Sequence, residues 1–443
     1  MFLKEELDNF RRKRPLSREL WEKSTRVLPG GISHNIRSFG LPSIGSYPVF
    51  IRLAHDACLV DVDGIEYDDF WIGHFSMILG HNHPEVQEII REWPVNGWHY
   101  GTNTSYQVEM AETLIRDNPA VEKVRFCTSG TEATMYATRL ARAFTGRRIV
   151  AKSRVGWHGA NDTLGGMIGD KSALGLQNVE EAGILTFDVD EESTFDMLRA
   201  HGSNIAAVIL EPVHGGGGGF PVDYGFLKRL REETEKLGIL LIFDEIITGY
   251  RYTYGLLQNK IGVYPDLVTM GKIVGGGFPI GVVGGRADIV EQANPLSERP
   301  VWIGGGTFSE FPLSMAVGLK TLELLKGAKK EYQRINREGA RILVELNKFL
   351  SDEKLPIVAT GHESLIMLHV LTKHVENPTI RDIIALTDKK RESLLQLALF
   401  NRNILGVHGI GGLSMAHTDQ QLARLKQAVE EIAIPVSKAE ITQ

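Results

Sequence analysis

The stretch ILLIFDEIITG (residues 239–249), together with DLVTMGKIVGGG (residues 266–277), decides the fold of this chain. In each stretch a short apolar run ends at a polar side chain: Asp244 follows LLIF, and Lys272 follows LVTM and one glycine. Short apolar runs between turn signals are typical of buried strands in a parallel sheet. Ligands bind outside the carboxyl ends of such strands. We therefore expect Asp244 and Lys272 to lie at the same edge of one sheet.

These two side chains have complementary chemistry. A lysine amine can form a Schiff base with an aldehyde, and a carboxylate can keep a heteroaromatic nitrogen protonated. An enzyme that uses pyridoxal 5'-phosphate needs both roles. Lys272 and Asp244 are therefore our candidates for the catalytic residues, and they predict pyridoxal 5'-phosphate as the cofactor.

Predicted strands and helices alternate along the middle of the chain, which favours an α/β fold with a mainly parallel, doubly wound sheet. The predicted strands are VRFCTS, RIVAKS, AAVILEP, ILLIFDE, LVTMGK and GVVGGR. After residue 310 the pattern changes to helices and a mixed segment. We predict a large cofactor domain at residues 75–310. A smaller α+β domain would combine residues 1–74 with residues 311–443, of which the first part is a junction helix.

Composition excludes several classes of function. The 443 residues carry a net charge of −6, which argues against a nucleic-acid binder. The N-terminus lacks the apolar core of a signal peptide, and no stretch is long enough to span a bilayer, so we expect a cytoplasmic protein with no membrane partner. The basic run Arg11–Arg14 is typical of a solvated segment more than of a targeting or anion-binding patch.

The cysteines and the closely spaced histidines show no pattern typical of a metal site. Cys58 and Cys127 are too few for a disulfide framework or a four-cysteine site. His81 and His83 have no further ligand at a suitable spacing, and the start of a helix at Pro84 explains them better. We therefore predict no metal site.

A third motif, Ser129-Gly130-Thr131, lies between a predicted strand and a predicted helix. Backbone N–H groups, two hydroxyls and the positive end of the helix dipole make such a turn a phosphate site, although a plain N-terminal cap would use the same residues. Two nucleotide motifs are excluded. Ile273 follows Lys272 where a Walker A loop needs Ser or Thr, and the run Gly215–Gly219 leads into Phe220-Pro221 rather than a helix.

With these motifs in place, the chain resembles the class III aminotransferases, which are pyridoxal-phosphate-dependent transferases of fold type I. Within that family it is similar to the branch of glutamate-1-semialdehyde 2,1-aminomutase. The resemblance covers about residues 17–420, nearly the whole chain. It is carried by VRFCTSGTEATMYATRLARAFTGR, WHG, ILEP, IFDEIITGYR, GKIVGGGFPIGVVGGR and GGTFSEFPLSMAVG, in that order.

The resemblance implies a role for each matching residue. Lys272 would form the Schiff base and transfer a proton, Asp244 would pair with the pyridine nitrogen, and Ser129, Gly130 and Thr131 would bind the phosphate. Trp157 stands where the family has Tyr or Phe stacked on the cofactor ring, and His158 matches the family histidine. Glu211 is either cofactor-proximal or a strand-end carboxylate held by backbone donors. Thr307 would reach the phosphate of a neighbouring subunit, which implies a homodimer.

The substrate side departs from the aminomutase pattern. Arg37 matches its carboxylate-binding arginine, with a surface or interface arginine as the alternative. His74 replaces a family tryptophan, and a histidine at this position resembles aminotransferases that act on D-phenylglycine. The segment HGIGGLS, which begins with His408, resembles aminotransferases that act on β-phenylalanine. Gly409 stands where the aminomutase has a glutamate. Residues 310–311 (Glu-Phe) replace Gly-Asn, and residues 159–175 lack the glycine-, serine- and proline-rich lid sequence.

From these departures we predict an intermolecular aminotransferase that moves an amino group between an amino acid, including D- or β-amino acids, and a keto acid. The first alternative is glutamate-1-semialdehyde 2,1-aminomutase. An amino-acid racemase or epimerase is the second alternative, since the same carbanion can be reprotonated on either face. A pyridoxal-phosphate-binding protein without turnover is the least favoured hypothesis, because Lys272 and Asp244 are both present.

Overall fold

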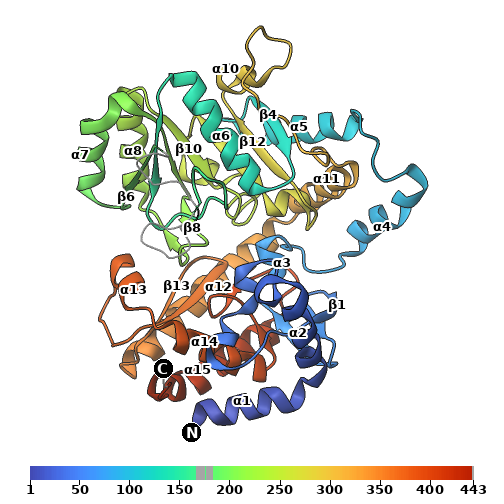
Figure 1. Ribbon diagram of the computed structural model, residues 1–443, viewed down its shortest axis with the longest axis vertical. Coiled ribbons are helices and arrows are strands. Elements are labelled where there is room, and N and C mark those ends of the chain that lie inside the picture. The colour runs from blue at the N-terminus through green and yellow to red at the C-terminus, as the bar shows by residue number, and fades with distance from the viewer. Residues whose placement is uncertain (166–174, 176–182, 442–443) are drawn as a thin grey trace. The chain divides into compact units, whose positions relative to one another are not determined.

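The computed structural model describes residues 1–165, 175 and 183–441. They form two compact units, one of Pro84–Tyr332 and one of Met1–His83 with Gln333–Gln443 (Figure 1). Helix α11 (Pro312–Gly327), predicted as a junction, packs on α4 (Pro84–Glu92) and α5 (Ser105–Asp117) within the larger unit. The units therefore divide the chain at 83/84 and 332/333, whereas the sequence predicted divisions at 74/75 and 310/311.

The larger unit is built on a seven-stranded sheet. Strand β10 pairs in parallel with β7 and β11, and β5 pairs in parallel with β7 and β6, whereas β12 runs antiparallel to both β11 and β4. The prediction of a mainly parallel sheet is confirmed. The order across the sheet is β4 (Lys123–Cys127), β12 (Gly281–Gly285), β11 (Leu267–Gly271), β10 (Leu240–Asp244), β7 (Ile205–Leu210), β5 (Ile149–Ser153) and β6 (Ile184–Phe187).

Both faces of this sheet are covered, which explains why its strands are apolar without alternation. Leu240 and Ile242 of β10 belong to the core cluster that α6 (Gly130–Thr145) fills from one side. Leu241 and Phe243 alternate with them and are fully buried on the opposite face. The pair α7 (Glu192–His201) and α8 (Tyr224–Lys236) packs side by side near β6 (Figure 1). Shorter elements of the unit are β8 (Val213–His214), β9 (Phe220–Pro221), α9 (Leu257–Ile261) and α10 (Ala287–Val290).

The register of the central strands places the two decisive residues at one edge. Asp244 ends β10 and lies opposite Thr269 of the parallel strand β11. Lys272 follows the last residue of β11 and opens a short 3-10 turn, η7 (Lys272–Gly275). The carboxyl ends of β10 and β11 therefore deliver an acid and an amine to the same side of the sheet.

The smaller unit is assembled from both chain ends. One sheet has the order β1 (Ile51–His55), β2 (Cys58–Asp61), β3 (Glu66–Asp69) and β15 (Ile404–Leu405), and a second has β13 (Ile357–His362), β14 (Leu365–Val370) and β16 (Gly411–Gly412). The helices are α1 (Phe2–Lys13), α2 (Pro15–Val27), α3 (Ile72–Phe75), α12 (Lys329–Asp352, which begins in the larger unit), α13 (Ile380–Leu386), α14 (Lys389–Asn401) and α15 (Asp419–Lys438). A fold type I transferase has this division into a large, mainly parallel domain and a smaller α+β domain.

One residue of the basic N-terminal run is structural rather than solvated. Arg14 is fully buried, and its guanidinium donates to the Phe400 carbonyl at 2.7 Å, to Asn401 Oδ1 at 3.1 Å and to Tyr67 Oη at 2.7 Å. These bonds attach the N-terminal helices to the end of α14. Arg11, Arg12 and Lys13 are exposed, as the sequence predicted for the whole run.

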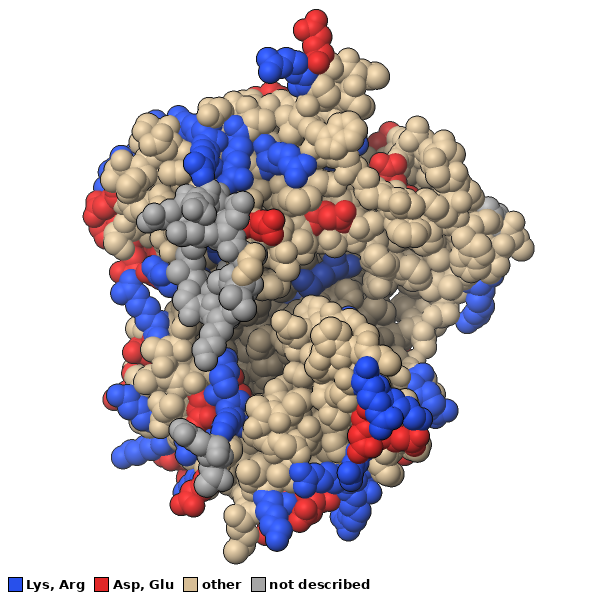
Figure 2. All heavy atoms as spheres, in the orientation of Figure 1, with Lys and Arg blue, Asp and Glu red and all other residues tan. Residues whose placement is uncertain are grey.

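The surface carries charges of both signs on each unit (Figure 2). Within the described residues, no helix combines the length and the apolar character that crossing a membrane would require.

Candidate active site

Lys272 is the amine at the edge of the sheet. It is half-buried behind β11, and its backbone has a positive φ of 49°, a conformation that a side-chain-bearing residue adopts only at a cost. Burial lowers the pKa of Lys272 below its usual value, while Asp244 and Glu211 oppose that shift. More of the amine is therefore uncharged near neutral pH than in a free lysine, which is the form that attacks a carbonyl carbon.

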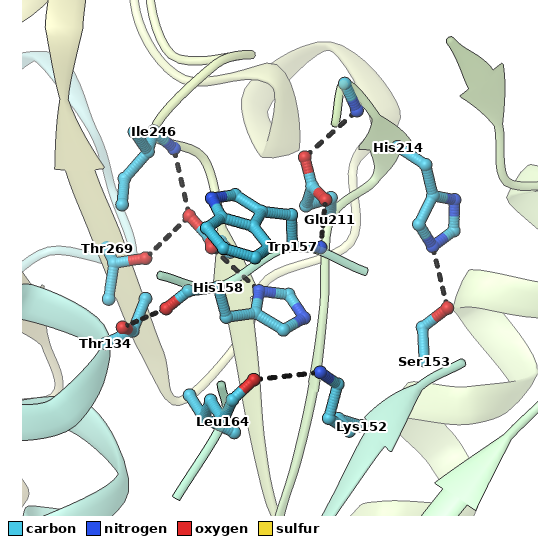
Figure 3. Close-up of polar contacts among 12 residues, drawn as sticks. Thr134, Lys152, Ser153, Trp157, His158, Leu164, Glu211, His214, Ile246 and Thr269 are labelled. Atoms are coloured by element: carbon cyan, nitrogen blue, oxygen red, sulfur yellow. Dashed lines mark hydrogen bonds and ion pairs between the residues drawn. The ribbon is translucent and has the colours of Figure 1, made fainter. Parts of the chain in front are cut away.

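Asp244 is held by donors on both oxygens (Figure 3). Its Oδ1 accepts from Thr269 Oγ1 at 2.9 Å and from the Ile246 N–H at 3.2 Å. Its Oδ2 lies 2.8 Å from His158 Nδ1. Burial lowers the pKa of His158, so the imidazole is neutral and Nδ1–H donates to the carboxylate. This arrangement fixes the orientation of the Asp244 carboxylate, the group that would pair with a protonated ring nitrogen.

The far nitrogen of His158 is buried and has no hydrogen-bond partner within the described ranges. The carbonyl of the same residue accepts from Thr134 Oγ1 of α6 at 2.6 Å. His158 is therefore fixed by two bonds, one to the helix and one to Asp244.

The Ser129-Gly130-Thr131 turn begins helix α6. Ser129 is the N-cap, and its Oγ accepts from the Glu132 N–H at 3.3 Å. Glu132 in return accepts from the Thr128 N–H at 2.9 Å and from Ser129 Oγ at 3.3 Å. The capping interpretation of this motif therefore holds. The phosphate interpretation stays a prediction and is compatible with it, because the positive end of α6 opens at the same turn.

Glu211 lies beyond the end of β7 with only 3% of its surface exposed. Its Oε1 accepts from the Trp157 N–H and its Oε2 from the Gly215 N–H, each at 3.0 Å. Burial, and secondarily the charge of Asp244, raises the pKa of Glu211 to about 8. The indole of Trp157 is 47% exposed, so a large aromatic face is open at this position.

Two buried groups beside this site escaped the sequence analysis. Lys152 is 2% exposed, its Nζ donates to the Leu164 carbonyl at 2.9 Å, and burial lowers its pKa to about 8. His214 Nε2 lies 2.8 Å from Ser153 Oγ, and burial lowers the pKa of His214 to about 3. The one available signal was a charged residue inside the apolar strand RIVAKS, which ordinarily indicates a paired or functional lysine.

The other predicted residues lie elsewhere. Thr307 belongs to the larger unit and is exposed in the turn before α11. Arg37 (exposed), His74 and His408 all belong to the smaller unit. Their proposed places around a substrate therefore stay predictions. The lid difference predicted for residues 159–175 falls largely on residues 166–174, which lie outside the described residues.

His74 lies in an unusual turn. Ile72, Gly73, His74 and Phe75 all have positive φ, between 43° and 69°. Left-handed residues normally occur singly, so four in succession indicate a conformation held by its surroundings. The His74 ring centroid lies 4.2 Å from that of Trp71 and 4.9 Å from that of His34.

His408 and Gly409 form the tip of a tight turn between Val407 and Ile410, which pair as an isolated bridge. Both have positive φ, 49° and 86°. A Cβ on Gly409 would lie 2.5 Å from Leu368 Cβ and 3.1 Å from the Leu368 nitrogen. Only glycine fits this backbone. Burial lowers the pKa of His408 to about 4.

The donor set of the larger unit fits a phosphorylated pyridine aldehyde. It offers an amine of lowered pKa for the aldehyde, an oriented carboxylate for the ring nitrogen, a helix N-terminus with two hydroxyls for the phosphate, and an open indole face for the ring. Each function of such a cofactor has a chemically matched partner.

Comparisons with known proteins agree with this assignment. A family model described as aminotransferase class-III matches residues 42–358. The glutamate-1-semialdehyde 2,1-aminomutase of Ignicoccus hospitalis is 42% identical over 318 residues, 70% of this chain and 74% of the relative. That of Thermoplasma acidophilum is 34% identical over 433 residues, 94% of this chain and 98% of the relative. The solved structure of a β-phenylalanine aminotransferase from Variovorax paradoxus superposes with a TM-score of 0.86 at 28% identity, covering 97% of this chain and 96% of its own.

Proposed function

Since the chain belongs to the class III aminotransferase family and is a pyridoxal 5'-phosphate-dependent enzyme, we propose that it moves an amino group on a small carboxylate-bearing compound and that its reaction is the 2,1-aminomutation of glutamate-1-semialdehyde. The observation that carries this choice is the relative of that name that is 34% identical over 94% of this chain. It favours the aminomutase over the intermolecular aminotransferase that the sequence departures predicted.

The residues of the larger unit have complementary tasks in this proposal. Lys272 would hold the aldehyde group of the cofactor, Asp244 the ring nitrogen, and Ser129, Gly130 and Thr131 the phosphate. When bound, the cofactor supplies an electron sink for the carbon that carries the amino group. His158 and Thr269 orient Asp244 for this role, since both donate to its carboxylate.

The proton transfers are assigned to Lys272. An amine whose pKa is lowered by burial can accept a proton from a carbon acid and return it to a neighbouring carbon near neutral pH. Trp157 would cover one face of the cofactor ring with its exposed indole. Arg37 would pair with a substrate carboxylate through its two-pronged guanidinium.

Intermolecular transamination is the second candidate, and one observation favours it. The aminomutase resemblance assigns a glutamate to position 409, yet Gly409 has a φ of 86° and lies against Leu368, so a side chain there does not fit. The likeness to a β-phenylalanine aminotransferase is consistent with a different substrate at this turn.

One pair of assays separates these candidates. The purified holoenzyme is given glutamate-1-semialdehyde alone, and separately a panel of D-, L- and β-amino acids, each with and without a keto acid. Isomerisation of the semialdehyde without an added acceptor supports the aminomutase. Amino transfer from the panel to the keto acid, with no isomerisation, establishes the second candidate instead. Racemisation without net transfer points to a racemase, and no reaction in any arm contradicts the proposal.

We also propose a cytoplasmic homodimer in which Thr307 contributes to the neighbour's phosphate site. Its exposed position in the turn before α11 is compatible with such a contact. Mixing K272A and T307A protomers tests it. If Thr307 acts across the interface, each mixed dimer contains one site with both residues intact and recovers the corresponding activity. If Thr307 acts within its own chain, mixing restores nothing.

A further inference from the structure

Glu211 joins two segments that are distant in sequence. One carboxylate oxygen accepts the N–H of Trp157 and the other the N–H of Gly215, both at 3.0 Å (Figure 3). The first segment carries Trp157 and then His158, whose imidazole holds Asp244. The second is the turn that connects β8 and β9. A single side chain thus fixes the backbone beside both the open indole and the buried carboxylate.

The glycine run explains why the second segment can come so close. A Cβ on Gly216 would lie 2.9 Å from Trp157 Cβ, and one on Gly217 would lie 2.3 Å from the Val155 carbonyl oxygen. The latter contact is with backbone and cannot be relieved by a rotamer change. The turn between β8 and β9 therefore packs directly on residues 155–157, and Glu211 links these two segments through its hydrogen bonds. This close packing explains the glycine run Gly215–Gly219, and it gives a second reason to reject the dinucleotide-binding interpretation, besides the absence of a helix after the run.

We propose that Glu211 is the positioning residue for Trp157 and His158, and so controls how tightly the larger unit holds its cofactor. This inference rests on the proposed cofactor site but not on which amino compound reacts. A carboxyl group accepts with both oxygens, whereas an amide accepts with only one. Glu211→Gln therefore retains shape and volume but opposes one backbone N–H with an NH2 group.

The chain offers a matched control. Glu245 is fully buried and also accepts two backbone N–H groups, from Leu257 at 2.5 Å and Gln258 at 3.0 Å. Those bonds fix the start of α9 and do not involve the Trp157 segment. Glu245→Gln thus removes the same kind of interaction from the same unit.

The test measures affinity of the cofactor-free protein for pyridoxal 5'-phosphate, together with the change in Trp157 fluorescence on binding, taken as the difference from a W157F background. We expect E211Q to weaken affinity by about tenfold, the ratio that corresponds to leaving one buried backbone N–H without an acceptor, and to alter the Trp157 signal. E211A should be weaker still, and E245Q should remain within about twofold of wild type even if its melting temperature falls.

Equal affinity of E211Q and wild type, or an equal loss in E245Q, would overturn the positioning role. These outcomes are distinct from failure of the proposed reaction, because wild-type cofactor binding is measured independently of any amino substrate.

A separate observation concerns the smaller unit. His55, Cys58 and Glu66 each offer one ligand atom, and these atoms all lie within 4.8 Å of one another. Strand pairing produces the group, since His55 pairs with Cys58 across the β1–β2 hairpin and Glu66 pairs with Val60 across β2–β3. Directly paired residues lie on the same face of a sheet, as do residues two apart in one strand.

The donors of this group suit zinc. Imidazole, thiolate and carboxylate are its common protein ligands, and three of them leave one position for water. The two nitrogens of His55 have separate partners: Nε2 lies 3.2 Å from Glu66 Oε2, and Nδ1 lies 3.3 Å from Asp56 Oδ2. Such a carboxylate behind a histidine orients the ring toward a metal. We infer that His55, Cys58 and Glu66 form a Zn²⁺ site.

Cobalt(II) reports on this site because thiolate ligation gives it an additional absorption band. The chain has two cysteines, so Cys127 provides the control. Titration of the metal-free holoenzyme with Co²⁺ and then Zn²⁺ should give one bound ion per chain and a thiolate band. C58S should lose the band and bind at least tenfold more weakly, E66Q should bind more weakly, and C127A should match wild type. Equal binding by C58S, or no binding by wild type, would refute the site.

Discussion

The carboxyl edge of β10 and β11 and the two turns of the smaller unit differ in how they are held. At the edge, Asp244 has three donors on its two oxygens and Lys272 follows a fully buried strand. The turns at His74 and His408 instead depend on positive φ and close packing. The edge holds the residues that we propose for the cofactor, and the turns hold two of the residues that we propose for the substrate. The proposed cofactor residue Asp244 is thus fixed by hydrogen bonds at the end of a buried strand, whereas His74 and His408 are held by strained backbone and packing.

The largest effect is expected from a substitution of Lys272, at the carboxyl edge of β10 and β11. Lys272→Ala removes the amine that would hold the aldehyde and transfer the proton. We expect loss of all amino transfer and of the visible absorption of the bound cofactor, with the fold retained because the side chain is not part of the core cluster. Retention of either property at wild-type level would contradict the assignment of Lys272. Circular dichroism provides the folding control.

The second prediction separates the role of Asp244 at this edge from that of Thr269, which donates to it. Asp244→Asn keeps the shape but removes the charge opposite the ring nitrogen, so we expect a fall in turnover on the order of 100-fold or more, comparable to the loss of a preorganised electrostatic partner. Thr269→Val removes only one donor to Asp244 and should cost much less. If T269V were as damaging as D244N, orientation rather than charge would be the role of Asp244.

The difference between the two regions also governs what the sequence could predict. Asp244 and Lys272 follow apolar strands, and the carboxyl ends of parallel strands share an edge, so local patterns were sufficient to predict their position. Arg14 resembles its exposed neighbours in sequence, and only the packing of α14 against the N-terminus explains its burial. The group at His55, Cys58 and Glu66 was missed because its members come together through strand register, which residue spacing does not encode.

The substrate side gives a smaller effect. Arg37→Ala should raise KM for a carboxylate substrate by about tenfold, the loss of one charge-assisted hydrogen bond, with little change in cofactor affinity. Arg37→Lys keeps the charge without the two-pronged geometry and should recover part of the loss. Unchanged KM in R37A would support the alternative that this arginine is a surface or interface residue. A fall in the cofactor affinity of R37A would instead contradict the assignment of cofactor binding to the sheet edge and of substrate binding to the smaller unit.

The smallest effect concerns His408 and the pH dependence of stability. Burial lowers its folded pKa to about 4, below the unfolded value near 6.5. The stability contributed by this depressed pKa is present above pH 6.5 and is lost as the pH falls toward 4, because the unfolded chain binds the proton first. Between pH 7 and 5.5 wild type should lose about 1 kcal/mol more than His408→Gln, measured by urea unfolding at both pH values. His214 and His417, whose pKa values burial also lowers, titrate alike in both proteins and cancel in the difference. A parallel loss in the two proteins would mean that His408 binds its proton equally in the folded and the unfolded chain, so that burial does not lower its pKa. The imidazole would then gain a positive charge in the folded protein below about pH 6.5, and it could share with Arg37 the pairing with a substrate carboxylate.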